Sequence, residues 1–327
     1  NTITNAFDDS LVGTNRATGS NSGKADVMEV FGIYGQASSS SGLSSEISRA
    51  LVQFDVTQVN TDRTAGKLPA QGSVNFFLKL YNTAHASTTP EDYKLTIARV
   101  TNAWEEGYGL DLDNYTDKTY DGVGSNWVNA NGTFTSGSFT MSLQGGANKA
   151  AMSGQTFTLT DSDGTSQTFT FNIANNTVAN GTIGMQSDSN TTQIINTIKL
   201  AINDASLSNL DIVASTITAL GDTDSEMRLL IKQKTTGYAG NTTVDLSGVT
   251  HLSVLDSAAG FTGGSGKWAT VGGDFSTSVN NFVDASFPEG TEDLEVDVTT
   301  IVENWLGGSP TTASYGFMVK LSSSLER

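Results

Sequence analysis

EDLEVDVTTIVENWLGGSPTTASYGFMVKL, residues 292–321, is the stretch that decides the fold, because its hydrophobic period changes twice. Apolar and acidic residues alternate over residues 294–298, which is typical of a strand with one buried face. Residues 298–305 then place apolar side chains at helical spacing, and the alternation returns over residues 315–319. The pattern predicts a strand, a short helix and a second strand that pack as one non-catalytic element.

The rest of the chain has the composition of a mainly β protein. Its 327 residues include 34 glycines and only 4 prolines, with abundant Ser, Thr and Asn, which is typical of many tight turns. Runs rich in β-branched and aromatic residues predict strands at residues 1–7, 27–34, 49–56, 74–81 and 93–100, with a Ser-rich loop at 36–46. Short strands separated by turns favour a jelly-roll-like β-sandwich over alternating strands and helices.

Residues 132–264 differ in amino-acid composition from the residues before them, because aromatic residues become rare and Thr, Asn and Gly dominate. Alternating residues around Asp163-Gly164 predict a hairpin, and residues 191–205 predict an amphipathic helix capped by Asn190 or Thr191. The segment therefore reads as a small inserted α+β domain.

From residue 265 onward the amino-acid composition again resembles that of residues 1–131. We expect a discontinuous β-sandwich, residues 1–131 plus 265–327, interrupted by the domain at 132–264. The alternative is two β-domains in series with no interruption.

Charge and composition exclude several classes of protein. The chain has 17 Lys and Arg against 34 Asp and Glu, a net charge of −17, so we expect no nucleic-acid partner. It has no cysteine, so it forms no disulfide and performs no thiol chemistry. It has no apolar run of about 18 residues, so we expect no membrane span.

Catalytic motifs are missing from the sequence. His85 and His251 fall in different predicted domains, and no HExxH, P-loop or GxSxG sequence occurs. Glu105 and Glu106 are adjacent and point apart, whereas the paired carboxylates of glycosidases must face each other. We therefore expect no enzymatic activity and no catalytic residue.

A calcium site is the best candidate for metal chemistry. Asp111, Asp113 and Asp117 supply oxygen ligands at close spacing in the loop sequence DLDNYTD, which suits Ca²⁺. The EF-hand pattern is incomplete, and a solvated acidic loop is the alternative. No other cofactor is expected.

The same loop, residues 101–127, also carries the candidate sugar-binding residues. Aromatic rings that stack on a sugar must be exposed. The loop offers Tyr108, Tyr115, Tyr120 and Trp127 for this role. Trp104 and Trp305 are expected in the core instead.

Four motifs occur in a recognisable order: RALVQFDV (49–56), RVTNAWEEG (99–107), W followed by GGDF (268–275), and DVT through W to YGF (297–317). Together they resemble the DNRLRE-type β-sandwich, which is related to carbohydrate-binding modules. A narrower resemblance to virion structural proteins of marine tailed phages rests on DVMEVFGIYGQ (26–36), LDLDNYTDKTYDGVGSNW (110–127) and SGQTFTLTDSDGTSQTFTF (153–171). The phage relatives of the outer domain usually lack the insert.

The resemblance implies a non-enzymatic structural protein located in the virion, as a capsid-associated, decoration, or tail or neck component. Its partners would be further copies of itself and other virion proteins, since arrays repeat one surface many times. The alternatives are a secreted or surface carbohydrate-binding module and a receptor-binding tail-fibre component. The carbohydrate-binding module would bind a glycan, for example a host-surface glycan, and the tail-fibre component would bind a receptor on the host.

Overall fold

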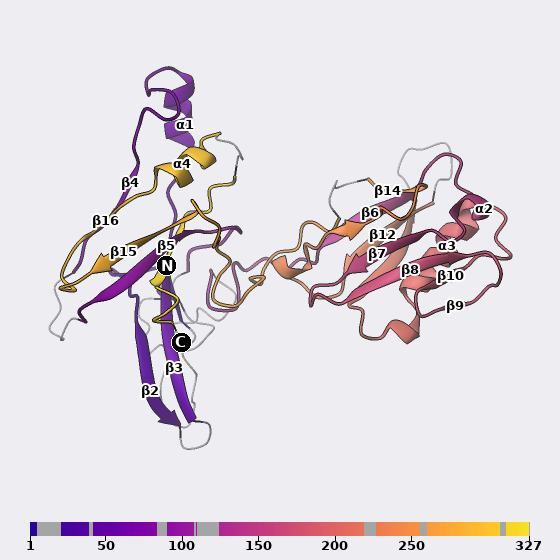
Figure 1. The fold of residues 1–327 in the computed structure, drawn as a ribbon, viewed down its shortest axis with the longest axis horizontal. Helices are drawn as coiled ribbons and strands as arrows, with labels where there is room; N and C mark the ends of the chain where they lie inside the picture. The colour runs from indigo at the N-terminus through magenta and orange to yellow at the C-terminus, as the bar shows by residue number, and fades with distance from the viewer. Residues whose placement is uncertain are drawn as a thin grey trace. The chain divides into compact units, whose positions relative to one another are not determined.

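The computed structural model describes residues 1–4, 21–38, 42–83, 90–107, 109, 124–218, 227–255, 260–307 and 312–326. The chain is mainly β, as its composition predicted (Figure 1). It divides into two compact units: unit 1 comprises residues 1–132 and 270–327, and unit 2 comprises residues 133–269. The sequence placed these two boundaries at residues 131 and 265.

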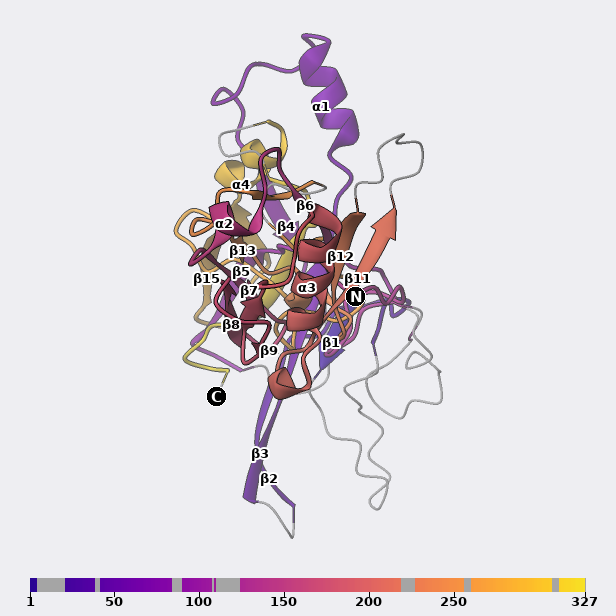
Figure 2. The same cartoon turned by 90° about the vertical axis from the view of Figure 1, so that its right-hand side faces the viewer.

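The described residues of unit 1 form a six-stranded antiparallel sheet with the order β1-β3-β17-β5-β15 and with β2 paired to β3. Its strands are β1 (Thr2–Thr4), β2 (Gly32–Ser38), β3 (Gly42–Val52), β5 (Tyr93–Arg99), β15 (Phe282–Phe287) and β17 (Phe317–Leu321). Strand β17 lies between β3 and β5. The end of the chain therefore completes a sheet that the N-terminal part begins. The β2–β3 hairpin extends beyond the rest of unit 1 (Figures 1 and 2).

A second layer covers part of one face of this sheet, which we call the inner face. It consists of the paired strands β4 (Phe77–Leu80) and β16 (Leu294–Asp297) together with helix α4 (Thr299–Trp305). The Trp305 ring lies 4.9 Å from that of Phe317. The core between the layers contains Ala50, Leu78, Ile97, Phe287, Leu294, Val296, Val298, Ile301, Val302, Trp305, Leu306, Phe317 and Val319. This arrangement is sandwich-like, and the predicted strand–helix–strand order of residues 292–321 is confirmed.

The strand predictions near the N-terminus were partly wrong. Strand β2 begins only at Gly32, and the Ser-rich stretch predicted as a loop supplies the end of β2 (residues 36–38) and the start of β3 (residues 42–46). Backbone pairing between strands does not require apolar side chains, so a polar hairpin carries no hydrophobic alternation to recognise. Strand β3 ends at Val52, and an unpredicted helix, α1 (Thr57–Thr64), follows. This helix has no buried residue, so its sequence has no helical stripe.

In the described part of unit 2 there are two sheets. One has the order β13-β7-β8-β10-β9 and the other has the order β11-β12-β6-β14. The strands are β6 (Ser138–Leu143), β7 (Thr156–Thr160), β8 (Ser166–Asn172), β9 (Val178–Ala179), β10 (Thr182–Gly184), β11 (Ile212–Thr218), β12 (Met227–Gln233), β13 (Val244–Asp245) and β14 (Leu252–Val254). Short helices α2 (Lys149–Met152), η2 (Ala205–Leu207) and η3 (Tyr238–Gly240) connect them.

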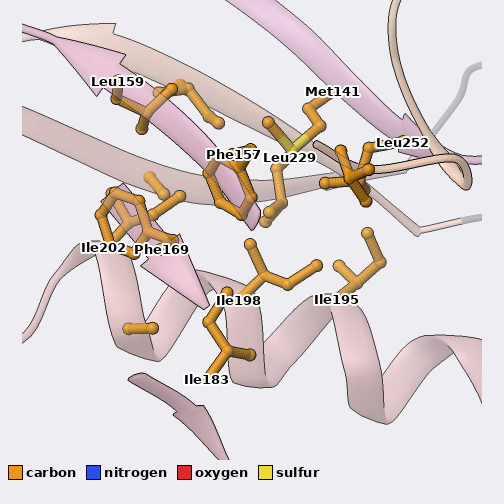
Figure 3. Packing of buried hydrophobic residues seen from close by; sticks show 14 of the residues in the cluster. Met141, Phe157, Leu159, Phe169, Ile183, Ile195, Ile198, Ile202, Leu229 and Leu252 are labelled. Carbon is orange, nitrogen blue, oxygen red and sulfur yellow. The ribbon is translucent and has the colours of Figure 1, made fainter. Parts of the chain in front are cut away.

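Helix α3 (Thr191–Ile202) packs its isoleucines against these sheets. Figure 3 shows Ile195 and Ile198 lying between the helix and the strands that carry Phe157 and Leu229. The side chain of Asn190 accepts a hydrogen bond from the Gln193 N–H at 2.9 Å, so the expected cap is present. The predicted hairpin is also present as β7 and β8, which pair in register on either side of the turn.

Candidate functional site

The loop predicted to bind calcium or sugar lies largely outside the described residues. This applies to the calcium candidates Asp111, Asp113 and Asp117, to the glycan candidates Tyr108, Tyr115 and Tyr120, and to His85. Within the described ranges, no group of three or more His, Asp or Glu residues is placed to hold a metal ion.

Trp127 is described, and its position corrects the expectation that it is an exposed platform for sugar. Its side chain is buried in unit 1, and the Arg49 guanidinium lies 4.8 Å from the centre of its ring. A sugar needs a free ring face, which this ring does not offer.

Trp305 and Trp104 were both expected in the core. Trp305 is in the core, whereas Trp104 is half-buried and donates from its indole N–H to the Tyr315 carbonyl at 2.8 Å.

A groove of about 880 Å³ in unit 1 is the candidate functional site. Its floor is the margin of the core between the two layers, where Tyr93, Leu95 and Leu321 are partly exposed while Ala50, Phe287 and Val319 are buried. The floor residues are Ala50, Tyr93, Leu95, Phe287, Val319 and Leu321, which the strand register places on one face. The rings of Tyr93 and Phe287 stack with their centres 4.9 Å apart. The floor is therefore apolar and has a flat aromatic pair at one edge.

One wall of the groove is the segment at residues 25–32, which is held against the sheet by hydrogen bonds from polar side chains of β1 and β3. The Ser48 hydroxyl donates to the Glu29 carbonyl at 2.8 Å and accepts from the Phe31 N–H at 2.9 Å. The Thr2 hydroxyl accepts from the Glu29 N–H at 3.3 Å. These bonds fix residues 25–31, which precede strand β2 and form no strand, beside the sheet, so their apolar side chains line the groove.

A further wall is formed by the residues that follow β4 and precede β5 and β16. The Asn82 backbone N–H donates to Asp293 at 2.8 Å, and its side-chain amide donates to the Gly290 carbonyl at 3.1 Å. Asp92 has a φ of 54°, in the left-handed region, and its N–H donates to the Pro288 carbonyl at 3.3 Å. These contacts hold the turns at this end of the groove together.

Apolar side chains at the groove are unusually exposed. Tyr81 is 80 % exposed, Val27 44 % and Met28 43 %, and all three line the groove. Single exposed apolar residues are ordinary on protein surfaces, but a set of them gathered around a concave apolar floor marks a binding surface. The groove also has the size of a ligand-binding cleft, for which the range is about 300–1,000 Å³.

The charge of the groove has one sign. Asp26, Glu91, Asp92 and Glu292 line it, whereas no Lys, Arg or His occurs among its described lining residues. The Glu289 N–H donates to Oε1 of Glu292 at 2.9 Å, and this bond holds the pKa of Glu292 below its ordinary value. Oε2 of Glu292 is shielded from solvent, and no described residue donates a hydrogen bond to it. The wall of the groove thus contains a carboxylate that ionises readily and whose Oε2 is enclosed.

The tyrosine on the floor stays neutral beside this carboxylate. Burial raises the pKa of Tyr93, and the negative charge of Glu292 raises it further. The arrangement therefore combines neutral apolar and aromatic contacts on the floor with negative charge at the walls. Such a surface suits a ligand that is mostly apolar and carries positive charge.

Comparison of the chain with known protein families, with curated proteins and with solved structures finds no match. No helix in the described ranges combines the length and the apolar character that crossing a membrane requires.

Proposed function

We propose that this chain is a non-enzymatic structural protein of a phage virion, capsid-associated, decorating the capsid, or part of the tail or neck. Its role would be assembly through contacts with other virion proteins. The virion setting draws on the resemblance of residues 26–36, 110–127 and 153–171 to phage structural proteins. The mode of assembly draws on the groove of unit 1.

The exposed apolar lining of the groove is the observation that supports the proposal best. Tyr81, Val27 and Met28 present apolar surface to solvent beside an apolar floor. A protein that assembles with others needs such surface, because burial of apolar area drives most protein association. The acidic walls favour partners of complementary charge.

Mass spectrometry of purified phage particles whose genome encodes this chain tests the proposal. We expect peptides of the chain at a fixed ratio to the major capsid protein. A copy number on the order of hundreds would indicate a head or tube array, and about 3, 6 or 12 copies would indicate a tail or neck position. Recovery of the chain only from the soluble fraction of lysed host cells would contradict a virion role.

Glycan binding is the second candidate function, and Tyr81 is the observation that favours it. Its ring is 80 % exposed and lies at the groove together with the polar side chains of Asn82 and Asp92. Aromatic faces beside hydrogen-bonding groups suit sugars. Binding on a glycan array that is lost in the Tyr81→Ala variant would support this candidate over protein assembly.

A further inference from the structure

We propose that the groove of unit 1 binds a peptide segment of another protein in which apolar residues are flanked by Lys or Arg. The inference rests on the proposed function in taking the occupant to be a protein. It goes further by naming the site and the chemistry of the partner.

The floor of the groove determines the apolar part of this segment. Leu95 and Leu321 are paired neighbours on β5 and β17 and are partly exposed, whereas the next pair on this face, Val319 and Ala50, is buried. These side chains offer no hydrogen bond, so polar groups of an occupant would lose their contacts with water there without replacement. Aliphatic or aromatic side chains fit this floor, whereas the hydroxyl groups of a sugar do not.

The walls determine the charge of the segment. Asp26 and Glu91 are exposed at the groove, and Asp92 and Glu292 add two further carboxylates. With no cation among the described lining residues, nothing within the lining neutralises them. Lys or Arg on either side of an apolar sequence would pair with the exposed carboxylates of Asp26, Glu91 and Asp92.

Charge also argues against a second copy of this chain as the occupant. Each copy has 34 acidic residues against 17 basic ones. Arg49, Arg63 and Lys320 are already paired with carboxylates of the same chain. Two copies would bring acidic surface against acidic walls, which is unfavourable for association.

A random peptide display library selected against the full chain provides the probe. We expect the enriched peptides to share an apolar centre with a positive net charge. Resynthesised and labelled, they should bind in fluorescence anisotropy with an affinity that falls as the salt concentration rises. Enriched peptides that are acidic, or whose binding does not respond to salt, would overturn the charge assignment.

Two pairs of variants locate the binding site. The double variant Met28→Ser with Tyr81→Ser removes exposed apolar surface without changing charge, and we expect it to weaken binding about tenfold or more. Its control is Val271→Ser with Val279→Ser, two exposed valines of unit 1 outside the groove, which should leave the affinity unchanged. An equal loss of affinity in the variant and in the control would show that the peptide does not bind in the groove.

The second pair tests the acidic walls. Asp26→Asn with Glu91→Gln should weaken binding about two- to fivefold for each charge removed. Asp284→Asn with Glu295→Gln, which removes two exposed acids of unit 1 that do not line the groove, should have no effect on binding. Because all these side chains are exposed, the unfolding free energy should change by no more than about 1 kcal/mol in each variant. Cross-linking of a benzophenone-bearing peptide to residues 25–32 or 80–83 gives a reading that needs no variant, and cross-links elsewhere would overturn the site.

The other occupants are distinguishable outcomes. A dimer in sedimentation velocity that the Met28 and Tyr81 double variant abolishes would overturn the inference in favour of a second copy. Glycan-array binding lost in the same variant, without peptide binding, would overturn it in favour of a sugar. Presence of the chain in purified particles without peptide binding would leave the proposed function standing and remove this inference. Peptide binding by a chain that is absent from purified particles would contradict the proposed function and leave this inference standing.

Discussion

Arg49 and Glu326 form a bidentate ion pair on the face of the large sheet opposite the groove. Nε donates to Oε1 at 3.0 Å and Nη2 donates to Oε2 at 2.8 Å, and both side chains are largely buried. Lys320 Nζ, also buried, donates to the same carboxylate at 2.7 Å. The guanidinium lies over the rings of Trp127 and Phe275. One carboxylate near the end of the chain therefore neutralises two buried cations on β3 and β17.

Replacing Glu326 with Gln is therefore expected to destabilise unit 1 strongly. The change keeps the shape of the side chain but leaves Arg49 and Lys320 as buried cations without an ionised partner. Breaking a buried ion pair in this way costs about 3–5 kcal/mol of unfolding free energy. Urea denaturation followed by tryptophan fluorescence measures the loss.

An exposed pair supplies the control for this prediction. Lys79 and Glu295 lie 2.9 Å apart on β4 and β16, with more than half of each side chain exposed. Glu295→Gln should change the unfolding free energy by only about 0–1 kcal/mol. Similar losses in the two variants would mean that burial does not set the strength of the Glu326 pairing.

Truncating Trp305 to Ala should unfold all of unit 1 and not only its C-terminal part. The indole is buried and packs on Phe317 of β17, which is hydrogen-bonded to β3 and β5. Loss of a core side chain of this size costs about 3–5 kcal/mol. Hydrogen exchange should quicken at amides of β3 as much as at those of β17, while the amides of α3 in unit 2 stay protected. Protection retained in β3 would show that the closing strands are a separate cooperative unit.

Excising unit 2 should leave unit 1 folded. The Gly272 N–H donates to the Trp127 carbonyl at 2.6 Å, so the chain leaves and re-enters unit 1 at neighbouring positions. A short Gly/Ser linker from Gly132 to Thr270 can join these ends, and the change in loop length alters the stability of unit 1 by about 1 kcal/mol or less. Circular dichroism and thermal melting of the shortened chain measure this, and a molten or insoluble product would contradict it.

Local patterns predicted much of unit 2 and of the closing stretch. The β7–β8 hairpin and helix α3 have one buried face each, and their hydrophobic periods match 2.0 and 3.6 residues. The β2–β3 hairpin and helix α1 carry no such signal. Helix α1 has no fully buried residue. It contacts unit 1 through Val59, which packs against the core, and through Arg63, which pairs with both carboxylate oxygens of Glu303 on α4 at 2.5 and 2.9 Å. An attachment between residues so distant in the chain is not visible in a local pattern.

The groove could not be predicted, because its lining comes from many separate parts of the chain. Residues 27–30 were assigned to a strand because of their apolar content, yet they form a wall held by Ser48 and Thr2. Tyr81 ended a predicted strand and gave no sign of its exposure. The only signal in the sequence was acidic residues beside apolar ones, such as Asp26 next to Val27, and this pairing is too common to identify a site.

Asp297 should make the stability of unit 1 depend on pH in the acid range. Hydrogen bonds from the Thr299 side chain and backbone hold the pKa of Asp297 below its ordinary value, and the Thr299 N–H donates to Oδ1 at 2.8 Å. A carboxylate with a lowered folded-state pKa stabilises the fold above its unfolded-state pKa of about 3.9, and this contribution is lost as the pH falls through the folded-state pKa. Asp297→Ala should therefore destabilise the chain at neutral pH, and its difference from the original chain should shrink below about pH 4. Unfolding free energies of both chains across this pH range measure the difference. A gap that stayed constant, or widened on acidification, would show that the ionised carboxylate does not stabilise the start of α4.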